Sequence, residues 1–153
     1  MLFFQYELSK TTRHLFVTYV KIFKERNKGA LNLRKVYNIL QHEGQLDFYL
    51  QQTAKFLPTG QMLADAELHA FIYIVEENEQ YSYLAFQQQT WGAMRHYIEQ
   101  QQNPVVLVGN ETIELIGFVE EIQSLIFNIE GNSNYGDAFV EQVEAMFANV
   151  LQQ

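Results

Sequence analysis

The chain of 153 residues contains no cysteine, and this absence removes several kinds of site at once. Without a thiol there is no disulfide, no thiolate nucleophile and no zinc site with cysteine ligands. No apolar run approaches the roughly 20 residues that cross a bilayer. No basic segment, apolar run and small-residue cleavage site follow one another as they do in a signal peptide. We therefore expect a cytoplasmic protein with no transmembrane segment.

Sequence motifs of known chemistry are also lacking. Nothing matches a phosphate-binding loop, a dinucleotide fingerprint, a calcium loop or the nucleophile turn of a hydrolase. The sequence therefore predicts no cofactor, and it favours a non-enzymatic protein while leaving an enzyme open.

Basic residues are few, with 10 Lys and Arg against 18 Asp and Glu and a net charge of −8. Their distribution is uneven, because residues 1–35 hold eight basic and two acidic residues (+6), whereas residues 36–153 hold two and sixteen (−14). An acidic body repels phosphates, so we expect no binding to nucleic acid. A simpler interpretation is that the acidity only keeps the protein soluble.

Apolar residues are plentiful at 48%, with 12 Phe and 9 Tyr, and the chain is long enough to bury a core. Residues 68–76 and 81–86 form two apolar runs joined by a short polar link, which predicts a β-hairpin. Alternate residues of the first run are apolar on both faces, namely Phe71, Tyr73 and Val75 on one and Ala70, Ile72 and Ile74 on the other. Such a strand belongs in the middle of a sheet.

The rest of the chain shows the periods of further strands and helices. Strands are predicted at 36–41, 45–50, 61–64 (a short edge strand), 105–108 and 112–116, and helices at about 89–101, 118–129 and 137–151. In the second of these strands Leu46, Phe48 and Leu50 are expected to face the core. The pattern predicts an α+β fold, with a mainly antiparallel sheet of about five to seven strands and helices packed mostly on one face.

One set of polar residues precedes the central hairpin. Asp65, Glu67 and His69 are two residues apart, so a continuous strand would place all three on one face. Two carboxylates and an imidazole could then bind a divalent metal, which is the basis of an alternative function as a metal-dependent hydrolase. A strand that enters from a loop is, however, commonly polar at its first positions.

A second candidate is the loop between the last two predicted helices. Asn132, Asn134, Tyr135 and Gly136 supply turn conformations, backbone amides and an aromatic hydroxyl that could bind an anion or a partner. The competing interpretation is a helix connection in which Gly131 ends one helix.

Four stretches carry a resemblance to a known family. They are Pro58-Thr-Gly-Gln-Met-Leu63, Ala70-Phe-Ile-Tyr-Ile74, Ile113-Glu-Leu-Ile-Gly-Phe-Val-Glu-Glu121 and Asn128-Ile-Glu-Gly-Asn-Ser-Asn-Tyr-Gly136. Over roughly residues 36–150 the chain resembles a small family of uncharacterised proteins from low-GC Gram-positive bacteria. The resemblance implies a bacterial cytoplasmic protein and brings with it no activity, cofactor or catalytic residue.

Residues 1–32 lie outside this resemblance, and residues 33–153 form the predicted acidic domain. The codons for residues 28–30 can contain a bacterial ribosome-binding sequence, and Leu33 can be encoded by TTG, an alternative start codon. One interpretation is therefore that residues 1–32 are a non-native extension created by a wrongly placed translation start.

The other interpretation is that the N-terminal segment is a genuine helix. Leu15, Tyr19 and Phe23 recur at helical spacing beside basic residues. Such a helix could dock on the acidic body or touch a membrane surface. For the whole chain we expect a protein that binds a protein partner or forms a homo-oligomer.

Overall fold

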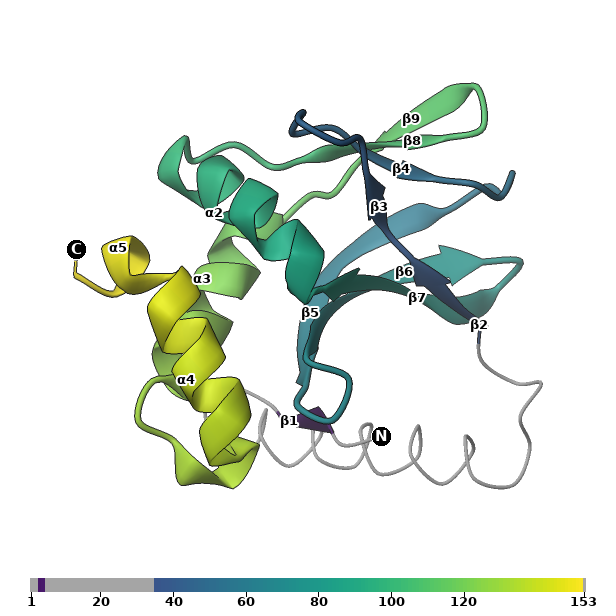
Figure 1. Cartoon of the computed structure of the whole chain (residues 1–153). Coiled ribbons are helices and arrows are strands. Elements are labelled where there is room, and N and C mark those ends of the chain that lie inside the picture. Colours follow the sequence, from purple (N-terminus) through teal and green to yellow (C-terminus); the bar gives the residue numbers. More distant parts are fainter. Residues whose placement is uncertain (1–2, 5–34, 153) are drawn as a thin grey trace.

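The computed structural model describes residues 3–4 and 35–152, so the predictions for residues 1–32 lie almost entirely outside it. The described chain combines helices with two mixed β-sheets (Figure 1). The α+β class is thus confirmed, whereas the prediction of one mainly antiparallel sheet is wrong.

The first sheet, sheet A, has the strand order β1-β5-β6-β7-β2. Its strands are β1 (Phe3–Phe4), β2 (Lys35–Asn38), β5 (Leu57–Asp65), β6 (Ala70–Glu77) and β7 (Gln80–Gln87). The predicted hairpin is confirmed as β6 and β7, and β6 lies in the middle of the sheet. Its turn residues, Asn78 and Glu79, both have positive φ, which suits the twist of a tight hairpin. All neighbours are antiparallel except β2 and β7, which are parallel.

The second sheet, sheet B, has the strand order β3-β4-β8-β9. Its strands are β3 (Leu40–Gln41), β4 (Phe48–Leu50), β8 (Val105–Val108) and β9 (Glu111–Glu114). The hairpin of β8 and β9 was expected from the sequence, but β4 and β8 are parallel.

The predicted strand 36–41 is divided between the two sheets. Ile39 is buried at 1% exposure, and its amide donates to the carbonyl of Ala85 over 2.9 Å. The chain leaves sheet A there and enters sheet B at the next residue. Alternation of apolar residues continues through such a crossing, and therefore the sequence pattern does not reveal it.

Two other strand predictions need correction. Leu46 lies in a loop at 39% exposure, so only Phe48 and Leu50 of the predicted inward set are buried. The strand expected at 61–64 is the nine-residue β5, which is flanked by β1 and β6 and interrupted by a bulge between Pro58 and Gln61. The described part of β1 explains why β5 is not an edge strand.

The helices gather on one side of sheet A, as expected (Figure 1). They are α2 (Trp91–Glu99), α3 (Phe118–Ile129), α4 (Asp137–Met146) and α5 (Ala148–Leu151). The prediction of one helix over 137–151 is wrong, because a break at Phe147 divides this region into α4 and α5. The side chain of Phe147 is fully buried in the core. None of the helices in the described ranges is long and apolar enough to cross a membrane.

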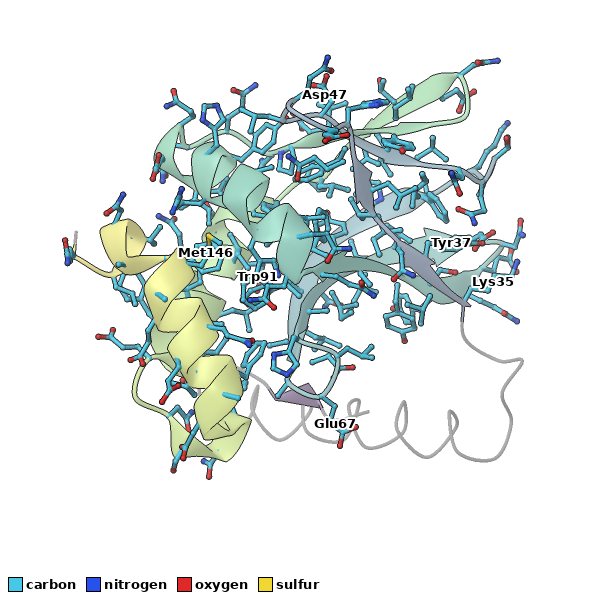
Figure 2. All side chains as sticks on the ribbon, in the orientation of Figure 1. Lys35, Tyr37, Asp47, Glu67, Trp91 and Met146 are labelled. Atoms are coloured by element: carbon cyan, nitrogen blue, oxygen red, sulfur yellow. The ribbon has the colours of Figure 1, made fainter. Side chains whose placement is uncertain are left out.

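The main core lies between the helices, sheet B and the face of sheet A that the helices cover. Trp91 is at its centre (Figure 2) and is fully buried, and its indole N–H donates to the carbonyl of Phe86 over 3.0 Å. The rings of Phe71, Phe139 and Phe147 surround it with centroid distances of 5.1, 5.9 and 6.0 Å. This aromatic cluster joins β6 to α2 and α4, and so fixes the helices on the sheet.

Candidate functional site

The three metal-ligand candidates do not lie on one continuous strand. Strand β5 ends at Asp65, and the chain turns through Glu67 and His69 before β6 begins. Asp65 Oδ1 accepts a hydrogen bond from the amide of Leu68 over 3.0 Å, whereas the imidazole Nδ1 of His69 is bonded to the side-chain oxygen of Gln142. The part of the chain that the structure describes holds no group of three or more His, Cys, Asp or Glu residues arranged for a metal. The expectation of one shared strand face is therefore wrong.

Asp65 nevertheless stands out, because its side chain is fully buried and Oδ2 has no hydrogen-bond partner among the described residues. Burial raises the pKa of this carboxyl above its ordinary value, against an opposing effect of the Leu68 amide. A folded-state pKa above the unfolded one means that stability is highest at low pH and falls as pH rises through the folded pKa. The ionised carboxylate thus destabilises the fold at neutral pH.

We expect Asp65→Asn to raise the melting temperature at pH 7, because the amide keeps the Leu68 hydrogen bond and carries no charge. Thermal unfolding monitored by circular dichroism from pH 4 to pH 8 measures this. The difference between the variant and the unchanged chain should shrink towards the acidic end. A variant less stable than the unchanged chain at pH 7 would contradict the assignment.

The candidate loop of Asn132, Asn134, Tyr135 and Gly136 is well packed. Tyr135 is only 2% exposed, and its hydroxyl accepts a hydrogen bond of 3.3 Å from the Asn128 amide. Burial raises the pKa of the Tyr135 hydroxyl. The Asn132 side chain accepts from the Asn134 backbone amide over 3.1 Å and begins a single 3₁₀ turn. The structure brings these residues together as the connection between α3 and α4, and their role as a ligand or partner loop stays a prediction.

Three of the four stretches that carry the family resemblance meet around Tyr73. Its hydroxyl donates to the carbonyl of Ile116 over 2.7 Å and accepts from the amide of Gly60 over 3.1 Å. Burial is the main reason that the pKa of Tyr73 is raised to about 12. A Cβ added at Gly117 would lie 3.2 Å from the Cα of Gly60. These residues thus join the bulge of β5 to β6 and to the start of α3.

A buried carboxylate lies at the β2 edge of sheet A. Glu77 is 9% exposed and accepts hydrogen bonds from the hydroxyls of Tyr37 (2.9 and 3.0 Å) and Ser82 (2.8 Å). Lys35 Nζ lies 3.5 Å from Glu77 Oε1, and Figure 2 shows Lys35 and Tyr37 together at this edge. Burial, followed by the hydrogen bond to Glu77 and then by the Glu77 charge, raises the pKa of Tyr37 to about 12. These contacts hold β2 to the central hairpin. The hydroxyls of Tyr37 and Ser82 both donate to the Glu77 carboxylate, which requires hydrogen-bond donors because it is buried.

The outer side of sheet B carries a pocket of about 370 Å³. Aliphatic, aromatic, amide and charged side chains share its lining, among them His42, Asp47, Tyr97, Gln102, Val105 and Leu107. Side chains of β8 alternate, so that Val106 and Val108 enter the core while Val105 and Leu107 remain 43% and 42% exposed. Beside them the ring of His42 stacks on Tyr49 at a centroid distance of 4.3 Å.

Sequence reasoning identified β8 but missed this pocket. A run of four aliphatic residues, as at 105–108, is typical of a strand that is buried on both faces. The structure buries only one face of β8, with Val106 and Val108 in the core and Val105 and Leu107 exposed. The sequence held one sign of the exposed apolar side chains. The polar strand β9 shows that this sheet has an exposed side, so an all-aliphatic strand beside it must place some aliphatic residues on that side.

The two mixed sheets and the helices around one core define a small α+β domain whose sheet B presents a pocket with apolar and polar side chains in its lining. The chain belongs to a family of unknown function (UPF0738), whose family model matches residues 34–147. This membership confirms the resemblance to an uncharacterised family.

Relatives in three genera of low-GC Gram-positive bacteria support the membership. A UPF0738 protein of Lysinibacillus sphaericus is 38% identical over 127 residues, which cover 79% of this chain and 100% of the relative. A relative in Staphylococcus epidermidis is 38% identical over 71% of this chain and 90% of its own length. UPF0738 protein YjbL of Bacillus subtilis is 40% identical over 59% of this chain and 74% of its own length. No solved structure matches the chain.

Proposed function

We propose that this protein works without catalysis, by binding another protein or a second copy of itself through the outer side of sheet B. One observation carries the proposal: Val105 and Leu107, on adjacent outward positions of β8, are both more than two-fifths exposed beside the 370 Å³ pocket. Neighbouring exposed aliphatic side chains around a hollow are typical of a surface that another molecule covers.

The pocket suits an apolar side chain that projects from a partner. Its volume of about 370 Å³ is at the small end of ligand sites, and it opens on the apolar side chains of β8. Asp47, Gln102 and Asn103 in the lining can give and accept hydrogen bonds to the backbone of the same partner. The net charge of −14 on residues 36–153 favours a partner surface that is neutral or basic.

Affinity capture from the native cell tests this function with three forms of the chain. The bait is the unchanged protein, Leu107→Lys, or Phe127→Lys, since Phe127 lies on α3 at a similar exposure of 47% but outside the pocket. We expect Leu107→Lys to reduce capture of a specific protein by roughly tenfold or more, as a charge buried in an apolar contact costs at least about 1.4 kcal/mol. Phe127→Lys should capture as the unchanged bait does. Equal capture by all three baits would contradict the proposed surface.

A further inference from the structure

Strand β9 is an edge of sheet B that no described strand continues. The order β3-β4-β8-β9 gives it one neighbour, β8, within the part of the chain that the structure describes. Its residues, Glu111–Glu114, are exposed except for Ile113, which is partly buried against the main core. Figure 1 shows the hairpin of β8 and β9 at the rim of the molecule, away from helices α2 to α5. An edge of this kind presents backbone groups to which a further strand can bind.

The hydrogen bonds around β9 show which backbone groups face the open side. The amide of Leu115 donates to the carbonyl of Pro104 over 2.9 Å, so the backbone groups of odd-numbered residues are directed towards β8. This direction alternates along an antiparallel strand, so the backbone groups of Thr112 and Glu114 are directed away from β8. The Glu114 carbonyl accepts from the Ile116 amide over 3.1 Å. The amide and carbonyl of Thr112 and the amide of Glu114 therefore face the open side.

A pocket of about 290 Å³ lies along the inner side of this edge. Phe56, Val108 and Ile113 contribute apolar side chains to its lining. Leu57 also lines the pocket and is 66% exposed, although it is a large aliphatic residue. The open edge of β9 is thus accompanied by a hollow that suits an apolar side chain.

The pocket is the open end of a seam between β9 and β5. At the closed end the Tyr73 hydroxyl donates to the carbonyl of Ile116, just after β9, and accepts from the amide of Gly60 in β5. Towards Glu111 the pocket separates β9 from the residues that lead into β5. A strand added to β9 would enter this open end. Alternate side chains of that strand would point into the pocket, because side chains of paired residues project to the same side of a sheet.

Charge indicates the kind of segment that fits. Lys55 and Glu111 both line the pocket and balance each other, whereas Glu114 lies on the outer side of the sheet, opposite Val105. Residues 36–153 carry a net charge of −14, so a basic segment is attracted to this edge. Pairing with β9 of a second copy would instead bring two acidic strands together, which like charges oppose.

We propose that the open edge of β9 binds an extended segment of another protein as an additional strand of sheet B. Aliphatic residues of the segment enter the 290 Å³ pocket, and the basic residues that alternate with them lie on the outer side near Glu114. Backbone hydrogen bonds to Thr112 and Glu114 supply affinity for an extended chain, and the alternating side chains supply specificity. This is a second binding surface, beside the outer side of sheet B.

A defined probe tests the proposal on the full chain, namely a short fluorescent peptide in which valine and lysine alternate. Fluorescence anisotropy measures its affinity for the unchanged chain, Thr112→Pro and Thr112→Val. Proline removes the outward amide without disturbing the hydrogen bonds to β8, while valine keeps that amide. We expect Thr112→Pro to weaken binding by roughly tenfold or more and Thr112→Val to retain it. A peptide in which valine and glutamate alternate should bind the unchanged chain more weakly than the lysine peptide.

Three results would overturn the proposal. One is equal affinity of the lysine peptide for Thr112→Pro and for the unchanged chain. Another is equal affinity of the unchanged chain for the two peptides, including binding of neither. The third is a dimer of the unchanged chain that Thr112→Pro dissociates, because a second copy would then occupy the edge. If circular dichroism shows that Thr112→Pro unfolds the domain, a lysine peptide with methylated backbone amides replaces this variant. Equal binding of the methylated and unmethylated peptides to the unchanged chain would then overturn the proposal.

Discussion

Replacing Trp91 by alanine should reduce the free energy of unfolding by about 3–5 kcal/mol, the range for truncating a large buried aromatic side chain. Trp91 is fully buried and lies within 6.0 Å, centroid to centroid, of Phe71, Phe139 and Phe147. Its loss leaves a cavity between β6, α2 and α4 and removes the hydrogen bond to the Phe86 carbonyl. Urea denaturation followed by tyrosine fluorescence or circular dichroism measures the change.

The neighbouring residue provides the control. A Cβ added at Gly92 meets nothing within 4 Å, so Gly92→Ala should be neutral or stabilise helix α2 by up to about 1 kcal/mol. A loss below about 2 kcal/mol for Trp91→Ala would mean that the aromatic cluster is not the centre of the core.

Gly117→Ala should cost about 2–4 kcal/mol, because backbone strain and overpacking add at this position. Gly117 has a φ of +74°, and its added Cβ would lie 3.2 Å and 3.3 Å from the Cα and carbonyl oxygen of Gly60. Both neighbours are backbone atoms of the β5 bulge that Tyr73 holds by a hydrogen bond. They cannot move aside without breaking that contact.

Gly131→Ala separates the two contributions. Gly131 also has a positive φ of +65°, but nothing lies within 4 Å of its added Cβ. We therefore expect only the backbone cost, about 1–2 kcal/mol. Chemical denaturation of both variants measures the two costs. If Gly117→Ala were no more destabilising than Gly131→Ala, the close approach of β5 to the start of α3 would be contradicted.

Elements that depend on neighbouring residues could be predicted from the sequence. The hairpin of β6 and β7 follows from alternation and a short link, and α2 and α3 follow from apolar residues at helical spacing. The division into two sheets could not, because it depends on which distant strands pair. The parallel pairs β2–β7 and β4–β8, and the crossing at Ile39, are decided by packing across the core.

The sites show the same limit. The expectation that Asp65, Glu67 and His69 share one strand face was wrong because the chain turns between Asp65 and His69. No Gly or Pro indicates a turn there, and His69 itself adopts a φ of 51°. The pocket on sheet B combines residues from His42 to Thr112, which no local pattern connects.

A translation start at residue 33 stays a prediction, and the experiments on the 153-residue chain described above do not test it. The intact mass of the protein from its native cell decides it, and an N-terminus at Met1 would end the hypothesis.

Photo-crosslinking inside the native cell tests the proposed binding function most directly. A photoreactive amino acid at position 107 lies on the outward side of β8 beside the pocket, and one at position 127 lies on α3 with similar exposure. Binding through sheet B predicts a discrete covalent adduct, with another protein or a second copy, from position 107 and none from position 127. No adduct at position 107, or the same adducts from both positions, would contradict it.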